Sequence, residues 1–254
     1  MDLKIAGLRA LITGGSKGIG QAVASVLAEE GCHLVLAARD PGALDQTAST
    51  ITSRHKIDVT TIAADLGTEE GVRKVADEAG PIDILVNNAG AIPPGTLMEV
   101  DDETWRRAWD LKVFGFISLC RAMYPAMAAR KAGVIVNIIG SAGEKLPPGY
   151  IAGATGNAAL MAFSRALGRS STADGIRVIG INPGATATAR QQMLMRVSAE
   201  KQLGDAERWL EMYKTMPFGR AGKPEEIAYA VAFFASPLSG YTSGTILTID
   251  GGAG

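Results

Sequence analysis

The sequence predicts an α/β protein: a single domain built on a doubly wound, seven-stranded parallel sheet with helices on both faces. The first observation is that short, uniformly apolar runs alternate along the chain with segments of ten or more residues that suit a helix. The second is that the first apolar run, Leu8 to Ile12, ends in a glycine-rich loop that passes straight into a helical segment. Because right-handed crossovers place helices over both faces of a parallel sheet, this alternation favours a doubly wound arrangement.

The expected elements follow one another without a linker, a composition shift or an internal repeat. Proline and glycine close several of the strands, as at Pro41 and Pro183. Strands are expected at 8–12, 33–38, 58–63, 82–86, 134–139, 176–181 and 245–249, and helices at 21–30, 43–54, 68–79, 101–131, 150–171 and 224–235. We therefore expect one domain over residues 1–254.

One long stretch, 187–216, does not follow this alternation. It carries several methionines and aromatic residues: Met193, Met195, Trp209, Met212, Tyr213 and Met216. Two interpretations are open: an amphipathic lid over an apolar substrate, or the internal packing of a helical hairpin.

Composition and charge narrow the class of partner. The chain has 254 residues, of which 47% are hydrophobic and 20% charged, as in a globular domain with a sizeable core. Its net charge is -1, without a basic run or an acidic tail, which disfavours nucleic acid and an anionic membrane. No apolar run approaches the roughly 18 residues of a spanning helix, and the first ten residues lack the pattern of a secretory signal. A small-molecule ligand and a cytoplasmic location are therefore expected.

Few residues suit metal or nucleophilic chemistry. Cys32 and Cys120 stand in apolar surroundings without CxxC spacing, which indicates buried thiols in a reducing compartment. His33 and His55 are the only histidines, and neither belongs to a cluster with metal-ligand spacing. We expect neither a metal site nor a Ser-His-Asp hydrolase.

The glycine-rich loop, residues 13–20, indicates a nucleotide site. Closely spaced glycines let backbone N–H groups approach a phosphate, and the N-terminus of the next helix adds positive dipole charge. A tight turn that binds no ligand can have the same glycines, so the residues at the other strand ends must distinguish a nucleotide site from such a turn. Ligands of doubly wound sheets bind beyond the carboxyl ends of the strands. Six residues are expected there: Gly14, Arg39, Asp65, Asn88, Ser141 and Pro183.

Four motifs together resemble the short-chain dehydrogenase/reductase family over essentially the whole chain. They are Gly14-x-x-x-Gly18-x-Gly20, Asn87-Asn88-Ala89-Gly90, Pro183-Gly184 with Thr188, and Arg220-x-Gly222-x-Pro224-Glu225-Glu226 with the tail Asp250-Gly251-Gly252. The resemblance implies a Rossmann fold that binds a nicotinamide dinucleotide, with Asp65 and Leu66 by the adenine and Thr188 on the carboxamide. It also implies a homotetramer built from the helices at 101–131 and 150–171.

The residues expected to line the cofactor lie in these motifs and at the strand ends. They are Gly14, Ser16, Lys17, Gly18, Ile19, Gly20, Arg39, Asp65, Leu66, Asn88, Ala89, Gly90, Asn157, Pro183, Gly184, Thr186 and Thr188.

The end of the second strand favours NADP(H) over NAD(H). Sites for NAD place a carboxylate there to bind the ribose hydroxyls, whereas this chain has Ala38 followed by Arg39. The planar guanidinium of Arg39 and the cation of Lys17 suit the dianionic 2′-phosphate of NADP. The alternative is that both are solvated surface cations.

The catalytic pattern of the family is only partly matched. The family moves a hydride between the nicotinamide and a carbonyl or alcohol carbon, with a tyrosine as proton carrier, a serine on the substrate oxygen, and a supporting lysine and asparagine. By the resemblance, Ser141 keeps the serine position. Gly153 stands at the tyrosine position, Asn157 at the lysine position and Lys112 at the asparagine position. Lysine and asparagine are thus exchanged between two helices that pack side by side in the family.

The exchange has two interpretations. Lys112 reaches into the space of the usual lysine and hydrogen bonds to Asn157, or Lys112 lies on a helix surface or subunit contact while Asn157 binds the ribose. Tyr150, one helical turn before Gly153, is the only nearby tyrosine; it is a candidate proton donor or a packing or substrate-contact residue. Glu144 and Lys145 are expected to be loop-surface charges.

Two functions follow from this sequence. The first is an NADP(H)-dependent oxidoreductase that interconverts an apolar carbonyl compound and a secondary alcohol through an altered proton relay. The second is an NADP(H)-binding protein without redox turnover that serves as a regulator or binding module. Ser141 favours the enzyme, and the missing Tyr-x-x-x-Lys pair favours the binding module.

Overall fold

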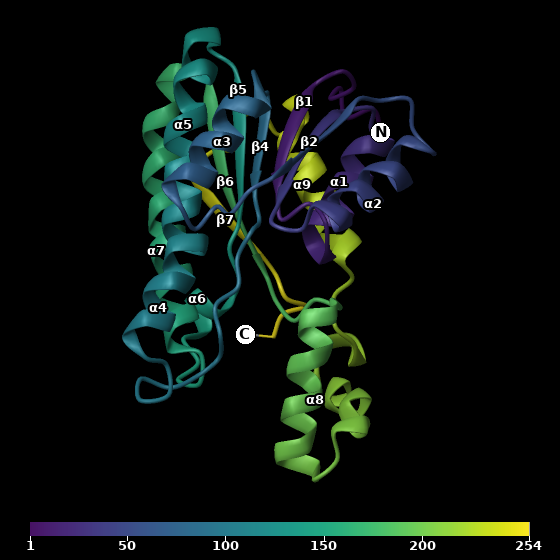
Figure 1. The fold of residues 1–254 in the computed structure, drawn as a ribbon, viewed down its shortest axis with the longest axis vertical. Helices are drawn as coiled ribbons and strands as arrows, with labels where there is room; N and C mark the ends of the chain where they lie inside the picture. The colour runs from purple at the N-terminus through teal and green to yellow at the C-terminus, as the bar shows by residue number, and fades with distance from the viewer. Residues whose placement is uncertain (254) are drawn as a thin grey trace.

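Strand β1 (Arg9–Thr13) lies inside a seven-stranded parallel sheet in the computed structural model, which describes residues 1–253 (Figure 1). The strand order is β3-β2-β1-β4-β5-β6-β7. The other strands are β2 (His33–Ala38), β3 (Val59–Ala63), β4 (Ile84–Asn87), β5 (Gly133–Ile138), β6 (Ile176–Pro183) and β7 (Thr245–Ile249). The order reverses between β1 and β4, the point at which doubly wound sheets bind ligands. The predicted fold class is confirmed.

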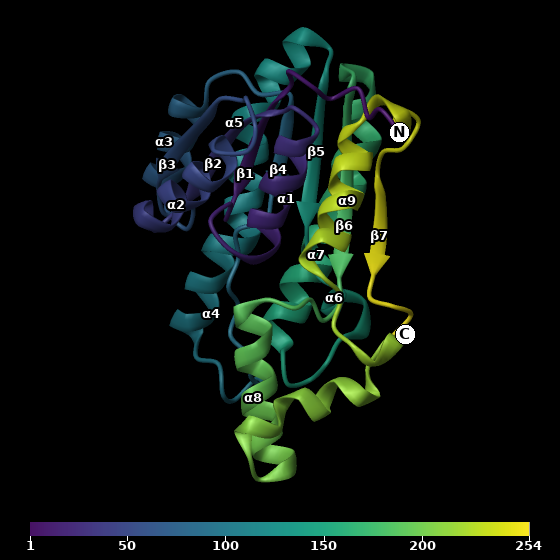
Figure 2. The same ribbon diagram turned by 90° about the vertical axis from the view of Figure 1, so that its right-hand side faces the viewer.

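Helices cover both faces of this sheet (Figures 1 and 2). One face carries α1 (Gly18–Glu29), α2 (Pro41–Thr52) and α9 (Pro224–Ala235), and the other carries α3 (Glu69–Ala79), α5 (Gly115–Arg130) and α7 (Ile151–Ser170). Along β1, Ala10 and Ile12 belong to the core on the first face, whereas Leu11 belongs to the core on the second. Burial on both sides explains why the strands are uninterrupted apolar runs in the sequence.

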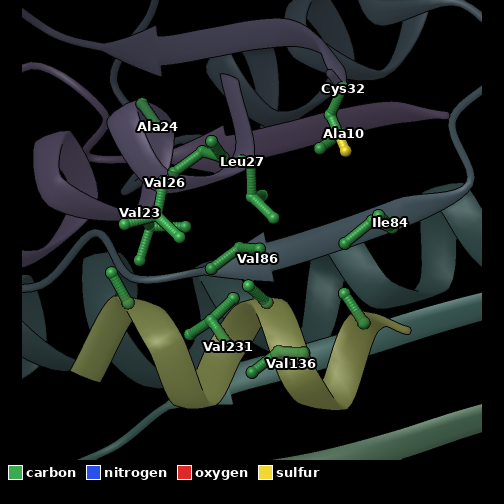
Figure 3. Packing of buried hydrophobic residues seen from close by; sticks show 14 of the residues in the cluster. Ala10, Val23, Ala24, Val26, Leu27, Cys32, Ile84, Val86, Val136 and Val231 are labelled. Carbon is green, nitrogen blue, oxygen red and sulfur yellow. The ribbon is translucent and has the colours of Figure 1, made fainter. Parts of the chain in front are cut away.

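The first face is packed tightly around α1 and α9. Figure 3 shows Val23 and Leu27 of α1, Val231 of α9 and Val86 of β4 within one cluster of buried side chains. Each fully buried valine or leucine contributes about 1.5–3 kcal/mol to folding. This packing holds α1 in place, so its first residue, Gly18, keeps a defined position beyond the end of β1.

A chain of buried amides joins β4, β5 and α7. Nδ2 of Asn87 donates to Oδ1 of Asn137 at 2.9 Å, and Nδ2 of Asn137 donates to Oγ of Ser164 at 2.8 Å. All three side chains are buried, where an unpaired polar group costs about 1–3 kcal/mol. The network therefore fixes the end of β4, from which residues 88–90 continue.

The helix expected at 101–131 is interrupted. It consists of α4 (Asp102–Trp109), a π-helical turn η1 (Asp110–Phe114) and α5. A π turn inserts one extra residue into the helical repeat, which the sequence pattern alone did not indicate. The turn carries Lys112 and lies against the segment after β3, where a Cβ at Gly115 would lie 2.9 Å from the carbonyl oxygen of Leu66.

The stretch 187–216 contains a long helix that the sequence analysis left unassigned. It forms α8 (Ala189–Leu203) and the 3₁₀ segment η3 (Ala206–Thr215), followed by η4 (Pro217–Gly219). Thr188 caps α8 by accepting a hydrogen bond from the backbone N of Gln191, and the hydroxyl of Tyr213 donates to Oε1 of Gln191 at 2.9 Å. This hairpin extends beyond the carboxyl ends of the strands (Figures 1 and 2).

The remaining short elements are α6 (Ala142–Lys145), η2 (Ser171–Asp174) and η5 (Pro237–Ser239). Within residues 1–253, no helix is both long enough and apolar enough to cross a lipid bilayer.

Candidate active site

The glycine-rich loop forms a cradle at the start of α1. Gly14 and Gly18 have φ values of 65° and 55°, which favour glycine. A Cβ at Gly20 would lie 2.2 Å from the carbonyl oxygen of Gly14, and one at Gly18 would lie 3.1 Å from Cγ2 of Thr188. The loop therefore folds tightly on itself at positions that only glycine fits, directly before the N-terminus of α1, where backbone N–H groups can meet a phosphate. Ser16, Lys17 and Ile19 complete this loop.

The segment after β4 is bound to the same loop. Oγ1 of Thr13 accepts hydrogen bonds from the backbone N atoms of Asn88 and Ala89 at 2.8 and 3.0 Å. Nδ2 of Asn88 donates back to the carbonyl oxygen of Thr13 at 3.0 Å. These bonds bring Asn88, Ala89 and Gly90 beside the glycine loop, as the sequence predicts.

A cleft of about 270 Å³ lies between the loop and the end of β2. Arg39 lines it and forms no ion pair with residues 1–253. Lys17 also lines it, with its Nζ 3.7 Å from Oδ2 of Asp40. The sequence analysis gave Asp40 no role at the site, although Oδ1 of Asp40 accepts from the backbone N of Ala43 and caps α2. The remaining lining residues are Gly14, Ser16, Ala38, Ala64, Leu66, Ala89, Gly90, Ala91 and Leu111.

Asp65 lies at the adjoining edge of this cleft. Its Oδ1 accepts a hydrogen bond from the backbone N of Gly67 at 3.0 Å, and the next residue, Leu66, is buried. Asp65 and Arg39 also line a second cleft of about 600 Å³, which extends to Arg190, Met193 and Leu194 of α8.

Ser141 lies beyond β5 with a hydroxyl that is not used by the protein. Its backbone N donates to the carbonyl oxygen of Pro183 at 2.9 Å, and the residue is 7% exposed. The hydroxyl caps no helix and has no hydrogen-bond partner among residues 1–253. Asn157 of α7 lies beside it, because a Cβ at Gly140 would lie 2.8 Å from Nδ2 of Asn157.

Lys112 reaches the same strand end from the π turn. Its Nζ donates to the carbonyl oxygens of Ile138 and Ile139 at 3.1 and 2.9 Å. Its stem passes over Gly90, where a Cβ would lie 2.2 Å from Cδ of Lys112. Burial and the charge of Arg190 lower the pKa of Lys112 to about 8.

The hydrogen bond between Lys112 and Asn157, part of one of the two interpretations of the exchange, is not formed in the described part of the chain. The backbone carbonyls of Ile138 and Ile139 are closer acceptors for the ammonium, and the Asn157 amide makes no hydrogen bond within the described part of the chain. Lys112 does not point freely into solvent, because the residue is half-buried and its ammonium donates to two strand-end carbonyls; its place in a subunit contact and the binding of the ribose by Asn157 stay predictions.

Tyr150 lies one residue before α7 with its ring over Gly153. A Cβ at Gly153 would lie 2.0 Å from Cζ of Tyr150, so the two positions share one face of the helix, as the sequence predicts. The ring packs with an apolar cluster that includes Ile92, Ala152 and Trp109. Burial raises the pKa of Tyr150, and the positive charge of Arg190 opposes that rise.

The strand end at β6 is joined to the glycine loop and to β7. Oγ1 of Thr186 donates to the carbonyl oxygen of Gly184 at 3.1 Å, while Thr188 contacts the glycine loop at Gly18 and caps α8. A Cβ at Gly184 would lie 2.6 Å from Cβ of Asp250. Pro183 and Gly184 thus lie between Ser141 and the end of β7.

Glu144 and Lys145 lie at the protein surface, as expected, but in the short helix α6 rather than in a loop, and both have partners. Nζ of Lys145 lies 2.8 Å from Oδ2 of Asp250, and Oγ1 of Thr248 donates to Oε2 of Glu144 at 2.8 Å. Both contacts bind α6, the helix that begins immediately after Ser141, to β7 and its end. Their partners are about a hundred residues apart in the chain, so no local pattern indicates them.

Arg190 is a further residue at this site that the sequence analysis missed. It lies in the first turn of α8, and its Nη2 donates to the carbonyl oxygen of Ile92. The signal in the sequence that could have indicated this residue is its positive charge two residues after Thr188. No group of three or more histidine, cysteine, aspartate or glutamate side chains within residues 1–253 is placed to hold a metal ion.

The comparisons with known proteins cover nearly the whole chain. The family model described as enoyl-(acyl carrier protein) reductase matches residues 14–254. Galactitol 2-dehydrogenase (L-tagatose-forming) of Cereibacter sphaeroides is 35% identical over 257 residues, covering 98% of this chain and 96% of that protein.

Solved structures agree with this match. The L-sorbose reductase of Gluconobacter frateurii, complexed with NADPH and L-sorbose, superposes with a TM-score of 0.93 at 35% identity, covering 99% of this chain and 98% of that chain. A 3-oxoacyl (acyl-carrier-protein) reductase of Agrobacterium tumefaciens C58 with NADP bound has a TM-score of 0.88 at 28% identity. The match covers 99% of this chain and 96% of that chain. With its fold, its glycine cradle and these relatives, the chain belongs to the short-chain dehydrogenase/reductase family.

Proposed function

We propose that this protein is an NADP(H)-dependent oxidoreductase that interconverts a carbonyl compound and a secondary alcohol, with Lys112 rather than a tyrosine as the proton source. The observation that carries the proposal is the ammonium of the half-buried Lys112, bound by the carbonyls of Ile138 and Ile139 just before Ser141, whose hydroxyl has no partner among residues 1–253. NADPH, when bound, supplies the hydride.

The binding of a dinucleotide is supported by the cradle. The close approaches at Gly14, Gly18 and Gly20 leave room only for backbone, so N–H groups at the start of α1 are the donors available to a pyrophosphate. Arg39, with no carboxylate partner in residues 1–253, is the cation available to a 2′-phosphate. The L-sorbose reductase was solved with NADPH and the 3-oxoacyl reductase with NADP, which supports NADP(H) rather than NAD(H) as the cofactor here.

The chemistry at the carbonyl needs one hydride and one proton. In reduction the carbonyl carbon takes the hydride from NADPH, its oxygen takes the proton, and the products are a secondary alcohol and NADP⁺. Ser141 donates a hydrogen bond that orients the substrate oxygen. An ammonium has three N–H donors, and two of those on Lys112 are held by carbonyls, so the third is available to the substrate oxygen or to a water between them.

The directions in which the two pKa values are shifted favour Lys112 over Tyr150 as the proton donor. A proton donor works best when its pKa is near the working pH, and the pKa of Lys112 is lowered to about 8. Burial raises the pKa of Tyr150 instead, and its ring packs among apolar residues. We assign Tyr150 to packing and substrate contact, and Asn157 to the cofactor ribose.

The segment 187–216 is proposed as a lid. Arg190, Met193 and Leu194 of α8 line the 600 Å³ cleft, together with Ala91, Pro93 and Pro94. Closing the cleft would exclude water from the reaction. The homotetramer stays a prediction, which light scattering on the purified protein tests.

The second candidate is an NADP(H)-binding protein without turnover. It is favoured by the raised pKa of Tyr150 together with Gly153, which has no side chain to pass a proton. The two functions are separated by direct NADPH binding measured beside NADPH oxidation over a broad panel of carbonyl compounds. Tight binding with no oxidation of any compound would establish the binding module and refute the enzyme.

A further inference from the structure

One of the two cations in the 270 Å³ cleft already has a carboxylate partner. The Nζ of Lys17 lies 3.7 Å from Oδ2 of Asp40, whereas Arg39 forms no ion pair within residues 1–253. Among the side chains that line this cleft, Lys17, Arg39 and Asp40 are the charged ones. Asp65 lines the second cleft together with Arg39 and, among the described residues, pairs with neither cation. The two cations of the cleft are therefore not equally available to an anion.

The position of Asp40 is fixed by the backbone around it. Asp40 is the N-cap of α2, and its Oδ1 accepts a hydrogen bond from the backbone N of Ala43 at 3.1 Å. Helix α2 is in turn bound to α1, because Nε2 of Gln21 donates to Oγ1 of the buried Thr47 at 3.2 Å. Since one carboxylate oxygen caps the helix, the other is held toward Lys17 at the edge of the cleft.

A 2′-phosphate that enters this cleft competes with Asp40 for Lys17. To reach the ammonium, the phosphate must displace Oδ2 of Asp40, and its two negative charges are also repelled by that carboxylate. The uncharged 2′-hydroxyl of NAD(H) meets neither effect. The carboxylate of Asp40 therefore acts on the difference between the two cofactors.

We propose that Asp40 is a specificity-determining residue: its carboxylate withholds Lys17 from the 2′-phosphate and so weakens the preference for NADP(H) over NAD(H). Arg39 is then the cation that selects the phosphate, and Lys17 contributes only when it leaves Asp40. This inference deepens the cofactor part of the proposed function and rests on the placing of the 2′-phosphate in this cleft. It does not depend on the redox step.

Asp40→Asn tests the inference by binding alone. Asparagine has nearly the shape of aspartate and caps helices equally well, so this variant removes the charge and keeps the bond to Ala43. NADPH and NADH are titrated calorimetrically into both proteins at low salt concentration. NADPH should bind about three- to tenfold more tightly to Asp40→Asn than to the wild-type protein, while the Kd for NADH should change by less than about twofold.

Lys17→Met shows whether the effect passes through Lys17. When Asp40→Asn is added to Lys17→Met, the gain in NADPH affinity should be at least about twofold smaller than in the wild-type protein, because no ion pair is left to break. A gain of the same size in both backgrounds would overturn the competition for Lys17. Asp45→Asn is the matched control, since it removes an exposed carboxylate from the same helix at a position that lines neither cleft. It should leave both Kd values unchanged within about twofold.

The remaining outcomes separate this inference from the proposed function. A wild-type preference for NADPH that Asp40→Asn leaves unchanged or reduces would refute the role of Asp40 alone. An equal gain for NADH would overturn it too, because the charge would then act on dinucleotides in general. If the wild-type protein binds both cofactors equally and Asp40→Asn creates no preference, the placing of the 2′-phosphate in this cleft fails together with the inference.

Discussion

The ring of Tyr150 occupies the space that a side chain at residue 153 would need. The Cβ of such a side chain would lie 2.0 Å from Cζ of Tyr150, well inside van der Waals contact. Gly153 is therefore required by its neighbour, and the two residues form one structural unit at the start of α7. A tyrosine side chain at position 153 cannot be accommodated while the ring of Tyr150 keeps its observed position.

Gly153→Ala should displace the Tyr150 ring and destabilise the protein. Overpacking of this kind costs about 1–3 kcal/mol in the free energy of unfolding, which urea denaturation measures. Gly149→Ala is the control, because a Cβ there would meet no atom of residues 1–253 within 4 Å, and it should change stability by less than about 0.5 kcal/mol. Equal stability of the two variants would show that Tyr150 moves aside at no cost.

Lys112→Met and Tyr150→Phe should differ in activity. If the ammonium supplies the proton, Lys112→Met lowers kcat for carbonyl reduction about 100-fold or more, the usual range for a general acid, whereas Tyr150→Phe lowers it by less than about tenfold. In the wild-type protein, kcat/KM for reduction should fall as the pH rises above about 8, where Lys112 loses its proton. A larger loss of kcat in Tyr150→Phe than in Lys112→Met would identify Tyr150 as the proton donor instead.

The buried ammonium should also affect stability in a pH-dependent way. The pKa of Lys112 is lowered from 10.5 to about 8, so between these pH values the unfolded chain holds a proton that the folded protein has released. Stability from this group therefore rises as the pH rises through that window, by up to about 3 kcal/mol, and the cost of the buried charge is present in full below pH 8. The free energy of unfolding of the wild-type protein, minus that of Lys112→Met, should increase from pH 8 to pH 10. A constant difference would mean that the pKa of Lys112 is ordinary.

Arg39→Ala should weaken binding of NADPH and leave binding of NADH nearly unchanged. A charge-assisted contact to the 2′-phosphate contributes about 1.5–3 kcal/mol, or roughly 10- to 100-fold in Kd. Raising the salt concentration should narrow the difference in Kd between NADPH and NADH for the wild-type protein, because salt screens an exposed contact between Arg39 and the 2′-phosphate. Arg54→Ala, which removes an exposed cation beyond the end of α2, is the control. A preference for NADPH that persists in Arg39→Ala would remove Arg39 from the 2′-phosphate site.

The fold and the cofactor cradle could be predicted from the sequence because they depend on local patterns. Apolar runs mark strands that are buried on both faces, and the glycines from Gly14 to Gly20 mark a loop that a side chain would obstruct. The position of Tyr150 over Gly153 also follows from their spacing of three residues along a helix.

The reaction end of the site could not be predicted in the same way. The π turn at 110–114 shifts the direction of Lys112 without any sequence mark, and the carbonyls of Ile138 and Ile139 that bind it carry no side-chain signature. The helix α8 was missed because its apolar residues do not follow one helical stripe. The hydrogen bond from Arg190 to Ile92 joins residues 98 positions apart.

The bonds that join α6 to β7 and its end have a consequence for how the chain matures. The glycine loop and Asn88 emerge from the ribosome early, and their mutual hydrogen bonds need nothing synthesised later. Ser141 precedes a helix whose partners, Thr248 and Asp250, emerge about a hundred residues afterwards. A nascent chain can thus join its glycine loop to the Asn88 segment early, whereas α9, which packs against α1, and the last strand, which binds α6, are added only at the end of synthesis.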